Sequence, residues 1–230
     1  MKKLMSATAV TKSKQGRSLL ATERTIRDLK CSNHHIFGVG DDGLFIFSDD
    51  DGESWAVRRF PTKASIWSIT TNSRGLVITH GEKVLYISTN SGKSWTPYYP
   101  FQFSNAPSIR SLCLYKNQLF IGTKIHPIYG GVWCFDLHDK STILIKKVPK
   151  QMISSMITIN NQLVVATGSC RSDVGRIEVC NMSQSIMEAS WEQCFGYVNQ
   201  SFLDLNESEG IIYATTTQNL MDLVPFLKFV

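Results

Sequence analysis

The sequence of 230 residues carries a formal net charge of +5, and 43% of its residues are hydrophobic against 19% that are charged. This composition suits one folded globular domain and excludes disorder over most of the chain. No apolar run reaches the length of a membrane span. The opening stretch, MKKLMSATAVTKSKQ, is a poor signal peptide because lysines interrupt its few apolar residues. The sequence therefore predicts a cytoplasmic protein without a membrane span.

The chain from residue 26 divides into five similar units, each of which opens with an apolar residue. The opening residues are Ile26, Ile66, Ile109, Ile153 and Phe202. Further apolar residues follow three and ten positions later in every unit, and the openings are 40, 43, 44 and 49 residues apart. Such spacing is typical of β-propeller blades, so we expect four strands in each complete unit. Fourth strands are expected to begin at Trp55, Trp95, Thr142 and Trp191.

Two units share a turn of nearly the same sequence, LFIFSDDDGESW at residues 44–55 and LYISTNSGKSW at residues 85–95. The matched positions are Ser48, Asp50, Gly52, Ser54 and Trp55, and then Ser88, Asn90, Gly92, Ser94 and Trp95. Asp and Asn side chains accept hydrogen bonds from backbone N–H groups in turns. Glycine supplies a positive φ, and a Trp ring can pack under the turn while its N–H finds an acceptor. An ordinary hairpin would explain one such turn, but five matched positions at a fixed offset favour a repeated motif.

The repeated turn resembles the Asp-box (BNR) hairpin of β-propellers. That hairpin joins the third and fourth strands of a blade in sialidases, sortilin-type receptors and photosystem II assembly and stability factors. The resemblance implies a propeller fold and, by itself, no chemistry. The third and fourth units keep the strand pattern but lose this turn, and the fifth unit stops after two strands, near Thr217.

Residues 4–24 supply a candidate for the missing half of the fifth unit. Their Gly16-Arg17-Ser18-Leu19 step matches the Gly-x-Ser-Trp step of the two turns. We therefore predict one all-β domain over residues 1–230, a β-propeller of about five four-stranded blades whose ring is closed by pairing of the N- and C-terminal strands. Closure removes the exposed sheet edge. The apolar tail, residues 218–230, has no assignment in this scheme.

The candidate binding residues follow the openings of the units. The innermost strands of a propeller line its channel, and the loops at the channel mouth form the usual binding surface. The predicted ligand-binding residues are Arg27, Asp28, Trp67, Arg110 and Asp204. Alternation places the residue after each opening on one side of the strand and the next residue toward the neighbouring blade. The alternative interpretation is structural, with Arg27–Asp28 and Arg110–Asp204 ion pairs filling the channel.

The sequence predicts no catalytic residues, metal ligands or cofactor. The five histidines have no zinc-ligand spacing, and the turn motif explains Asp49 to Asp51 better than a calcium loop does. No phosphate-binding glycine loop is present. Specific nucleic-acid binding is not expected, because the basic residues are spread over different units. These basic residues are Lys12, Lys14, Arg17, Arg58, Arg59, Lys146, Lys147 and Lys150.

Six cysteines occur without a CxxC pair, and most of them fall in apolar, strand-like runs. We therefore expect reduced, buried thiols, as is usual for a cytosolic protein. Pairing of Cys170 with Cys180 across a hairpin remains the alternative.

The blade pattern IRDL…FGVG…FIFSDDDGESW most resembles the photosystem II assembly and stability factors. That resemblance implies a non-enzymatic propeller that holds a partner protein, partly through arginines on the channel face. Arg27 and Arg110 fall where such arginines would be. The chain departs from that family in having fewer blades, fewer intact turns and no export signal. We predict a binding or scaffold propeller that recognises a protein or a small polar ligand at the channel mouth.

The alternative function is carbohydrate binding, either as a lectin-like propeller or as a degenerate sialidase-type glycosidase. Aromatic rings that could stack on a sugar are those of Trp67, Tyr129 and Trp133. Sialidases carry a Phe/Tyr-Arg-Ile-Pro segment near their start, and the nearest match here, Arg59-Phe60-Pro61, lies in the wrong strand. The resemblance to sialidases therefore favours sugar binding over hydrolysis.

Overall fold

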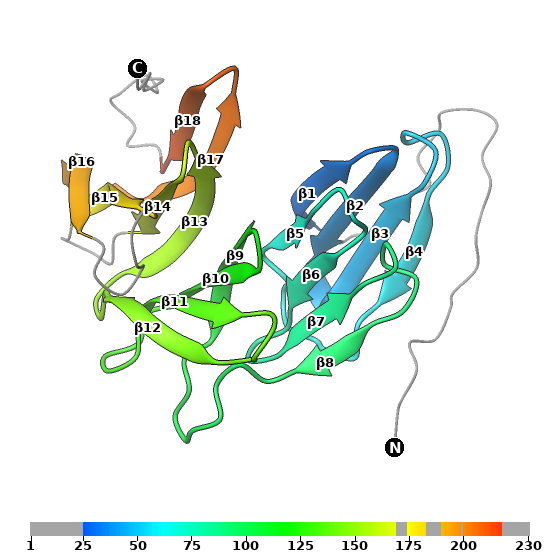
Figure 1. Cartoon of the computed structure of the whole chain (residues 1–230), viewed down its shortest axis with the longest axis horizontal. Coiled ribbons are helices and arrows are strands. Elements are labelled where there is room, and N and C mark those ends of the chain that lie inside the picture. Colours follow the sequence, from blue (N-terminus) through cyan, green and yellow to red (C-terminus); the bar gives the residue numbers. More distant parts are fainter. Residues whose placement is uncertain (1–24, 169–173, 183–189, 199, 218–230) are drawn as a thin grey trace. The chain divides into compact units, whose positions relative to one another are not determined.

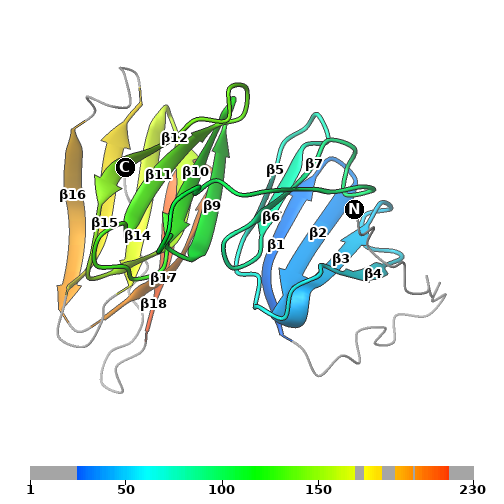
Figure 2. The same cartoon turned by 90° about the horizontal axis from the view of Figure 1, so that it is seen from below.

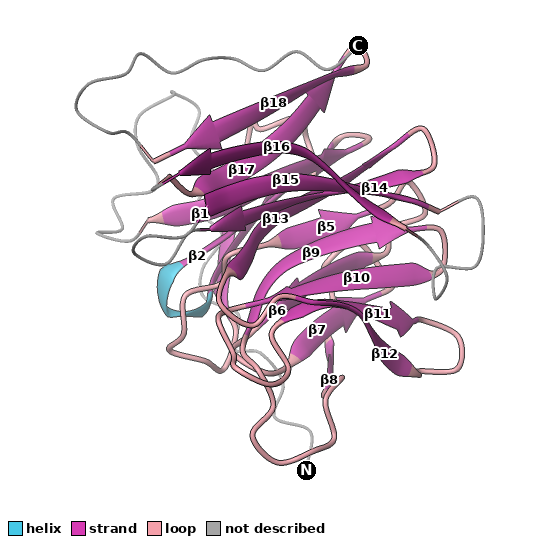
Figure 3. Ribbon diagram, turned by 90° about the vertical axis from the view of Figure 1, so that its left-hand side faces the viewer, coloured by secondary structure: helices cyan, strands magenta, loops and turns pink. Residues whose placement is uncertain are grey.

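Residues 25–168, 174–182, 190–198 and 200–217 are described by a computed structural model of the chain, and they form two compact units that divide after Pro100 (Figure 1). β-Strands dominate these residues, and one short 3-10 helix, η1 (Asp41–Gly43), joins the second and third strands (Figure 3). No helix in this part of the chain is long and apolar enough to cross a membrane.

The first unit contains two four-stranded antiparallel sheets in which neighbouring strands follow one another along the chain (Figure 2). The first sheet consists of β1 (Ile26–Ser32), β2 (His35–Gly40), β3 (Leu44–Ser48) and β4 (Ala56–Arg59). The second sheet consists of β5 (Ile69–Thr71), β6 (Val77–His80), β7 (Leu85–Ser88) and β8 (Thr96–Tyr98).

The second unit contains two four-stranded sheets and a two-stranded one. The third sheet consists of β9 (Ile109–Tyr115), β10 (Gln118–Thr123), β11 (Gly131–Asp136) and β12 (Thr142–Lys147). The fourth sheet consists of β13 (Met152–Ile159), β14 (Gln162–Gly168), β15 (Val174–Asn181) and β16 (Trp191–Val198). The remaining pair is β17 (Phe202–Ser208) and β18 (Ile211–Thr216).

The five predicted units therefore correspond to four complete sheets and one partial sheet among the described residues. Ile26, Ile109 and Phe202 open their strands as predicted, and β13 begins one residue before Ile153. The prediction for the second unit is wrong by three residues, because β5 begins at Ile69. Ile66 instead donates its backbone N–H to the carbonyl oxygen of Gly40 at 3.0 Å, which ties this segment to the end of β2. The predicted strand pair in residues 4–24 and the tail 218–230 lie outside the described residues.

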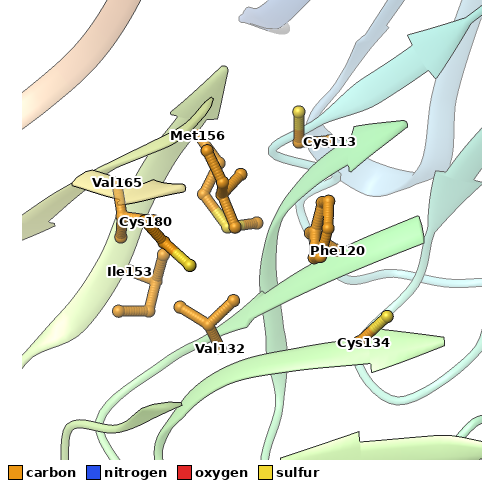
Figure 4. Packing of buried hydrophobic residues seen from close by; sticks show 9 residues of the cluster. Cys113, Phe120, Val132, Cys134, Ile153, Met156, Val165 and Cys180 are labelled. Carbon is orange, nitrogen blue, oxygen red and sulfur yellow. The ribbon is translucent and has the colours of Figure 1, made fainter. Parts of the chain in front are cut away.

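Apolar side chains from facing sheets fill the space between them. In the first unit the cluster joins the first and second sheets and is rich in aromatic rings, with the centroids of Phe60 and Tyr86 only 4.4 Å apart. In the second unit one cluster lies between the third and fourth sheets and another between the fourth sheet and β17–β18. Figure 4 shows Val132, Met156 and Cys180 pointing into the first of these two clusters. Alternating apolar residues thus bury both faces of the inner strands.

The described cysteines are free thiols. Cys113, Cys134 and Cys180 are buried, and burial raises the pKa of the Cys134 thiol to about 11. Cys31 and Cys194 are exposed, and Cys194 is the extra residue of a bulge in the edge strand β16. Cys170 lies outside the described residues. Burial also raises the pKa of the Cys180 thiol, so Cys134 and Cys180 are held in their protonated, unreactive form.

The first predicted turn is stabilised by side-chain hydrogen bonds within four residues. Ser48 Oγ accepts the backbone N–H of Gly52 at 2.8 Å and donates to Asp50 Oδ1 at 2.8 Å. Asp50 Oδ1 also accepts the N–H of Ser54 at 2.8 Å, and Trp55 Nε1 donates to the Gly52 carbonyl at 3.0 Å. Gly52 has a φ of 93°. The acidic residue, the glycine and the Trp N–H therefore each take part in holding the turn.

The second turn repeats these contacts. Ser88 Oγ accepts the N–H of Gly92 at 2.9 Å and donates to Asn90 Oδ1 at 2.9 Å. Asn90 Oδ1 accepts the N–H of Ser94 at 2.9 Å, and Trp95 Nε1 donates to the Gly92 carbonyl at 3.0 Å. Gly92 has a φ of 78°. Equal spacing in sequence therefore produces equal turns.

Candidate binding site

Arg27 occupies an irregular position near the start of β1. The pairing of β1 with β2 moves from Ile26–Gly40 directly to Asp28–Val39, so Arg27 is the extra residue of a β-bulge. Its guanidinium donates from Nε to Asp41 Oδ1 at 2.9 Å and from Nη2 to Asp41 Oδ2 at 3.0 Å. The same guanidinium lies 4.5 Å from the centroid of the Trp67 ring. A bulge, an ion pair and an aromatic ring together fix the direction of this side chain.

Asp41 is the partner of Arg27 in this candidate site, and the sequence did not single it out. It follows β2 directly, and its backbone N–H donates to the Thr25 carbonyl at 3.1 Å. Hydrogen bonds from the side chains of Arg27 and Ser65 lower the pKa of the Asp41 carboxyl, which is therefore charged at neutral pH. The signal was present in the hairpin itself, because antiparallel pairing brings the end of one strand to the start of the other.

Asp28, the next residue of β1, is turned toward the neighbouring sheet. Its Oδ2 accepts the backbone N–H of Ile69 at 2.9 Å, and its Oδ1 lies 3.6 Å from Lys30 Nζ. In the structure Arg27 forms its ion pair with Asp41, where the structural alternative had assigned Asp28 as the partner. Asp28 therefore links the innermost strands of two adjacent sheets.

The same position links adjacent sheets in the second unit. Ser111 Oγ donates to the Ile153 carbonyl at 2.8 Å. Ser155 Oγ accepts the backbone N–H of Leu205 at 3.2 Å and donates to Asp204 Oδ1 at 2.7 Å. The second residue after an opening thus acts in several units as a connection to the next sheet, which is a structural role.

Arg110 and Asp204 belong to the second unit, on strands β9 and β17. Strand β13 packs against both of these strands. Arg110 is again the bulged residue, since the β9–β10 pairing moves from Ser111 to Ile109. Of the five predicted site residues, the structure brings Arg27 and Trp67 into direct contact and assigns Asp28 and Asp204 hydrogen bonds that join neighbouring strands.

The aromatic residues proposed to stack on sugars differ in their accessibility. Trp133 is only 7% exposed and packs against Phe101, with ring centroids 5.0 Å apart. Its Nε1 donates to the Tyr129 carbonyl at 3.0 Å. Trp67 is half-buried, with the Arg27 guanidinium over its ring. Trp67 is therefore the more accessible of the two tryptophans.

Within the described ranges, no three His, Cys, Asp or Glu side chains are grouped closely enough to hold a metal ion. The acidic residues of the first turn are instead engaged in the turn. Asp50 accepts the hydrogen bonds given above, and Asp51 Oδ2 lies 2.8 Å from His34 Nδ1.

No protein-family model matches the chain. Its sequence is 40% identical over 205 residues to "Uncharacterized protein YkuO" of Bacillus subtilis (strain 168), an alignment that covers 88% of this chain and 69% of that protein. The chain belongs to the YkuO family. Its relative has no described activity, so membership of the family leaves the function to be argued from structure.

Solved structures similar to this YkuO-family chain are β-propellers. The WD40 repeats of RRP9 match with a TM-score of 0.58 and 17% identity, over 82% of this chain and 59% of that one. A structure titled "YCF48 bound to D1 peptide" matches with a TM-score of 0.56 and 15% identity, over 86% and 78% of the two chains. The extracellular domain of the putative one-component system BT4673 from B. thetaiotaomicron matches with a TM-score of 0.65 and 14% identity, over 94% and 29%. At these identities the likeness shows the fold alone, an all-β propeller.

Proposed function

We propose that this YkuO-family propeller is a non-enzymatic binding or scaffold protein that recognises a protein partner through a site centred on Arg27. The observation that supports this proposal is the fixed guanidinium, held by two hydrogen bonds to Asp41 and by the Trp67 ring. A side chain fixed before binding loses little conformational freedom when a ligand arrives. Arginine and tryptophan are also the residues most enriched at binding hot spots.

The chemistry of the site favours a peptide that brings a hydrogen-bond acceptor and an apolar group. Asp41 neutralises the Arg27 charge, so a backbone carbonyl suits the site as well as a carboxylate does. Among the described residues, Nη1 of Arg27 has no hydrogen-bond partner and is available to such an acceptor. The partly exposed edge of Trp67 offers an apolar surface beside it. The neighbouring structure of YCF48 contains a bound peptide, which makes peptide recognition a reasonable use of this fold.

The finer features of the fold belong to the same proposal. We infer a single domain of five blades that is closed by pairing residues 4–24 with the β17–β18 sheet, and we assign the two turns to the Asp-box motif. The two-stranded state of the last sheet supports this proposal, because further strands would cover its open edge. We also propose Arg110 and Asp204 as binding residues of the second unit, and a cytoplasmic location.

Peptide display on the purified chain tests the proposal. We expect enrichment of peptides that bind the unmodified protein, and we expect Arg27→Ala to weaken their binding at least about tenfold, which corresponds to 1.4 kcal/mol. Arg74→Ala is the matched control, since Arg74 is an exposed arginine on the β5–β6 turn. Failure to enrich any peptide, or equal binding by Arg27→Ala, would contradict the proposal.

Carbohydrate binding is the second candidate, and the half-buried Trp67 ring is the observation that favours it. Aromatic rings stack on the apolar faces of sugars, and this contact needs the ring more than it needs the guanidinium. A glycan array separates the two candidates. Sugar binding predicts that the unmodified chain retains glycans and that Trp67→Ala loses them. Neutral glycans should still bind Arg27→Ala, whereas the sialylated glycans expected of a degenerate sialidase carry a carboxylate and should bind that variant more weakly. An array without retained glycans leaves peptide recognition as the better proposal.

A further inference from the structure

A second, chemically different pocket lies in the second unit, where residues of β12 and β15 line it together with the connection from β12 to β13. Its volume is about 330 Å³. The polar residues that line it are Lys146, Lys147, Lys150, Gln151, Arg176 and Glu178. Four cationic residues and one acidic residue therefore line one small space. None of these residues belongs to the candidate site around Arg27, so the pocket is independent of the proposed function.

Strand alternation explains how β15 contributes to this pocket. Ile177 is fully buried in the cluster shared with β17, and Cys180 is buried in the cluster shared with the third sheet. Arg176 and Glu178 therefore share with Cys180 the face of β15 that is directed at the third sheet. On that face Cys180 is surrounded by apolar side chains, and Glu178 forms an ion pair. Arg176, two residues before Glu178, is a cation that lines the pocket.

The ion pair between the third and fourth sheets forms the inner wall of the pocket. Lys146 Nζ lies 2.9 Å from Glu178 Oε1, and both side chains are largely buried, with 15% and 13% exposed. The same ammonium lies 4.5 Å from the centroid of the Trp191 ring. Glu178, the one carboxylate of the lining, is therefore already engaged with Lys146.

The segment that follows β12 is held firmly, so the pocket has a built floor. Val148 donates its backbone N–H to the Gly130 carbonyl at 2.8 Å. Gln151 is only 5% exposed, and its side-chain amide donates to the Val174 carbonyl on the facing strand. Pro149 lies between these two anchored residues and restricts the backbone further. The backbone of this segment is thus anchored at Val148 and at Gln151.

The remaining cations have no partner within the described part of the chain. No ion pair or side-chain hydrogen bond involves the charged groups of Lys147, Lys150 or Arg176 there. Like charges gathered around one small space repel each other unless an anion lies between them. Lysine ammonium and arginine guanidinium groups are the usual ligands of phosphate and carboxylate oxygens.

We propose that this pocket binds a compact oxyanion that carries at least two negative charges, as phosphate or carboxylate groups. Lys147, Lys150 and Arg176 supply the charge, while the Lys146–Glu178 pair and Gln151 shape the wall. A volume of about 330 Å³ falls at the small end of ligand pockets, which suits a small molecule. A long nucleic acid would instead need an extended basic surface.

Isothermal titration of the full chain with inorganic pyrophosphate tests this proposal, with citrate as the carboxylate probe at the same ionic strength. We expect at least one probe to bind. Tighter binding of pyrophosphate identifies the ligand as phosphate-bearing, and tighter binding of citrate identifies it as carboxylate-bearing. Lys150→Gln and Arg176→Gln should each weaken binding about tenfold or more. Both residues are exposed, so the variants are expected to fold.

Lys124→Gln is the matched control, because it removes one exposed positive charge from the second unit outside this pocket. Glu178→Gln should act in the opposite direction and tighten binding several-fold, since it removes the one carboxylate and frees Lys146. The proposal would be overturned if neither probe binds, or if the pocket variants bind as tightly as the unmodified chain. It would also be overturned if Lys124→Gln loses as much affinity as the pocket variants do. Binding of a single-stranded oligonucleotide alone, with neither small anion bound, would overturn it as well.

Discussion

The two turns of the first unit have the same local structure but different surroundings. In both, a serine, an acidic or amide residue, a glycine and a tryptophan form matching hydrogen bonds within four residues. Beyond these bonds the turns differ. Trp95 packs edge-on against Phe45 of β3 and against Phe60, which follows β4, and its ring centroid lies 5.2 and 4.9 Å from theirs. Among the described residues, Trp55 has no such ring contact.

A second difference lies in the acceptor residue itself. Asp50 Oδ2 accepts a hydrogen bond from Ser54 Oγ at 2.6 Å, whereas Asn90 Nδ2 donates to Ser94 Oγ at 2.8 Å. The direction of this bond is reversed, yet the backbone of the turn is the same. The motif therefore requires one oxygen that accepts the backbone N–H and tolerates either a charged or a neutral group beside it. Local geometry is set by the motif, and stability is set by what lies next to it.

Replacing the tryptophan should give the largest difference in unfolding free energy between the two turns. Trp95→Ala deletes a ring that contacts two core aromatic residues, and we expect a loss of about 3 kcal/mol of unfolding free energy. The loss of unfolding free energy in Trp55→Ala should be smaller than that in Trp95→Ala by about 1–2 kcal/mol. Urea unfolding of both variants measures the difference. Equal losses would mean that the ring contacts of Trp95 add nothing to the turn.

Replacing the two turn glycines should give the second largest difference in stability loss. Both have positive φ, so alanine is strained at either position, at about 1 kcal/mol. A Cβ on Gly92 would also lie 3.1 Å from Phe45 Cζ, whereas on Gly52 its nearest neighbour is Ile36 Cδ1 at 3.5 Å. We expect Gly92→Ala to cost about 2–3 kcal/mol and Gly52→Ala about 1 kcal/mol. Thermal unfolding provides the test, and a larger loss in Gly52→Ala would contradict it.

The serines should behave alike. Ser48 and Ser88 are both 1% exposed, and each accepts the N–H of the turn glycine. Alanine at either position leaves a buried donor without its acceptor, which costs about 1–2 kcal/mol. Urea unfolding of Ser48→Ala and Ser88→Ala should give equal losses. Unequal values would show that the two turns are not the same structure.

The smallest expected effect is on pH dependence. Hydrogen bonds from the side chain and then the backbone of Ser54 lower the pKa of Asp50 from 3.8. A lowered folded pKa contributes stability above the unfolded value, and this contribution is lost as the pH falls through the folded pKa. The stability difference between the unmodified chain and Asp50→Asn should therefore shrink as the pH is lowered below 3.8. Asn90→Asp is the reciprocal control, and it should make the second turn acid-sensitive.

The sequence by itself determined the features whose partners lie close together along the chain. The hydrogen bonds that the serine, the acidic residue and the tryptophan of the first turn share with its glycine and second serine span at most four residues, so residues 48–55 contain all of these partners. Strand order could also be predicted, because neighbouring strands follow one another and the apolar residues recur at blade spacing. The four complete sheets and the partial fifth follow from that repetition.

Only the tertiary structure decided which distant side chains meet. Arg27 and Asp41 are 14 residues apart, and Lys146 and Glu178 are 32 residues apart. These pairings depend on strand register and on bulges at Arg27 of β1 and Ile145 of β12, each of which shifts the alternation of side chains by one residue. Bulges leave no reliable mark in a single sequence. For this reason the sequence alone did not predict that Lys146, Lys147 and Lys150 line one pocket with Arg176 of another strand.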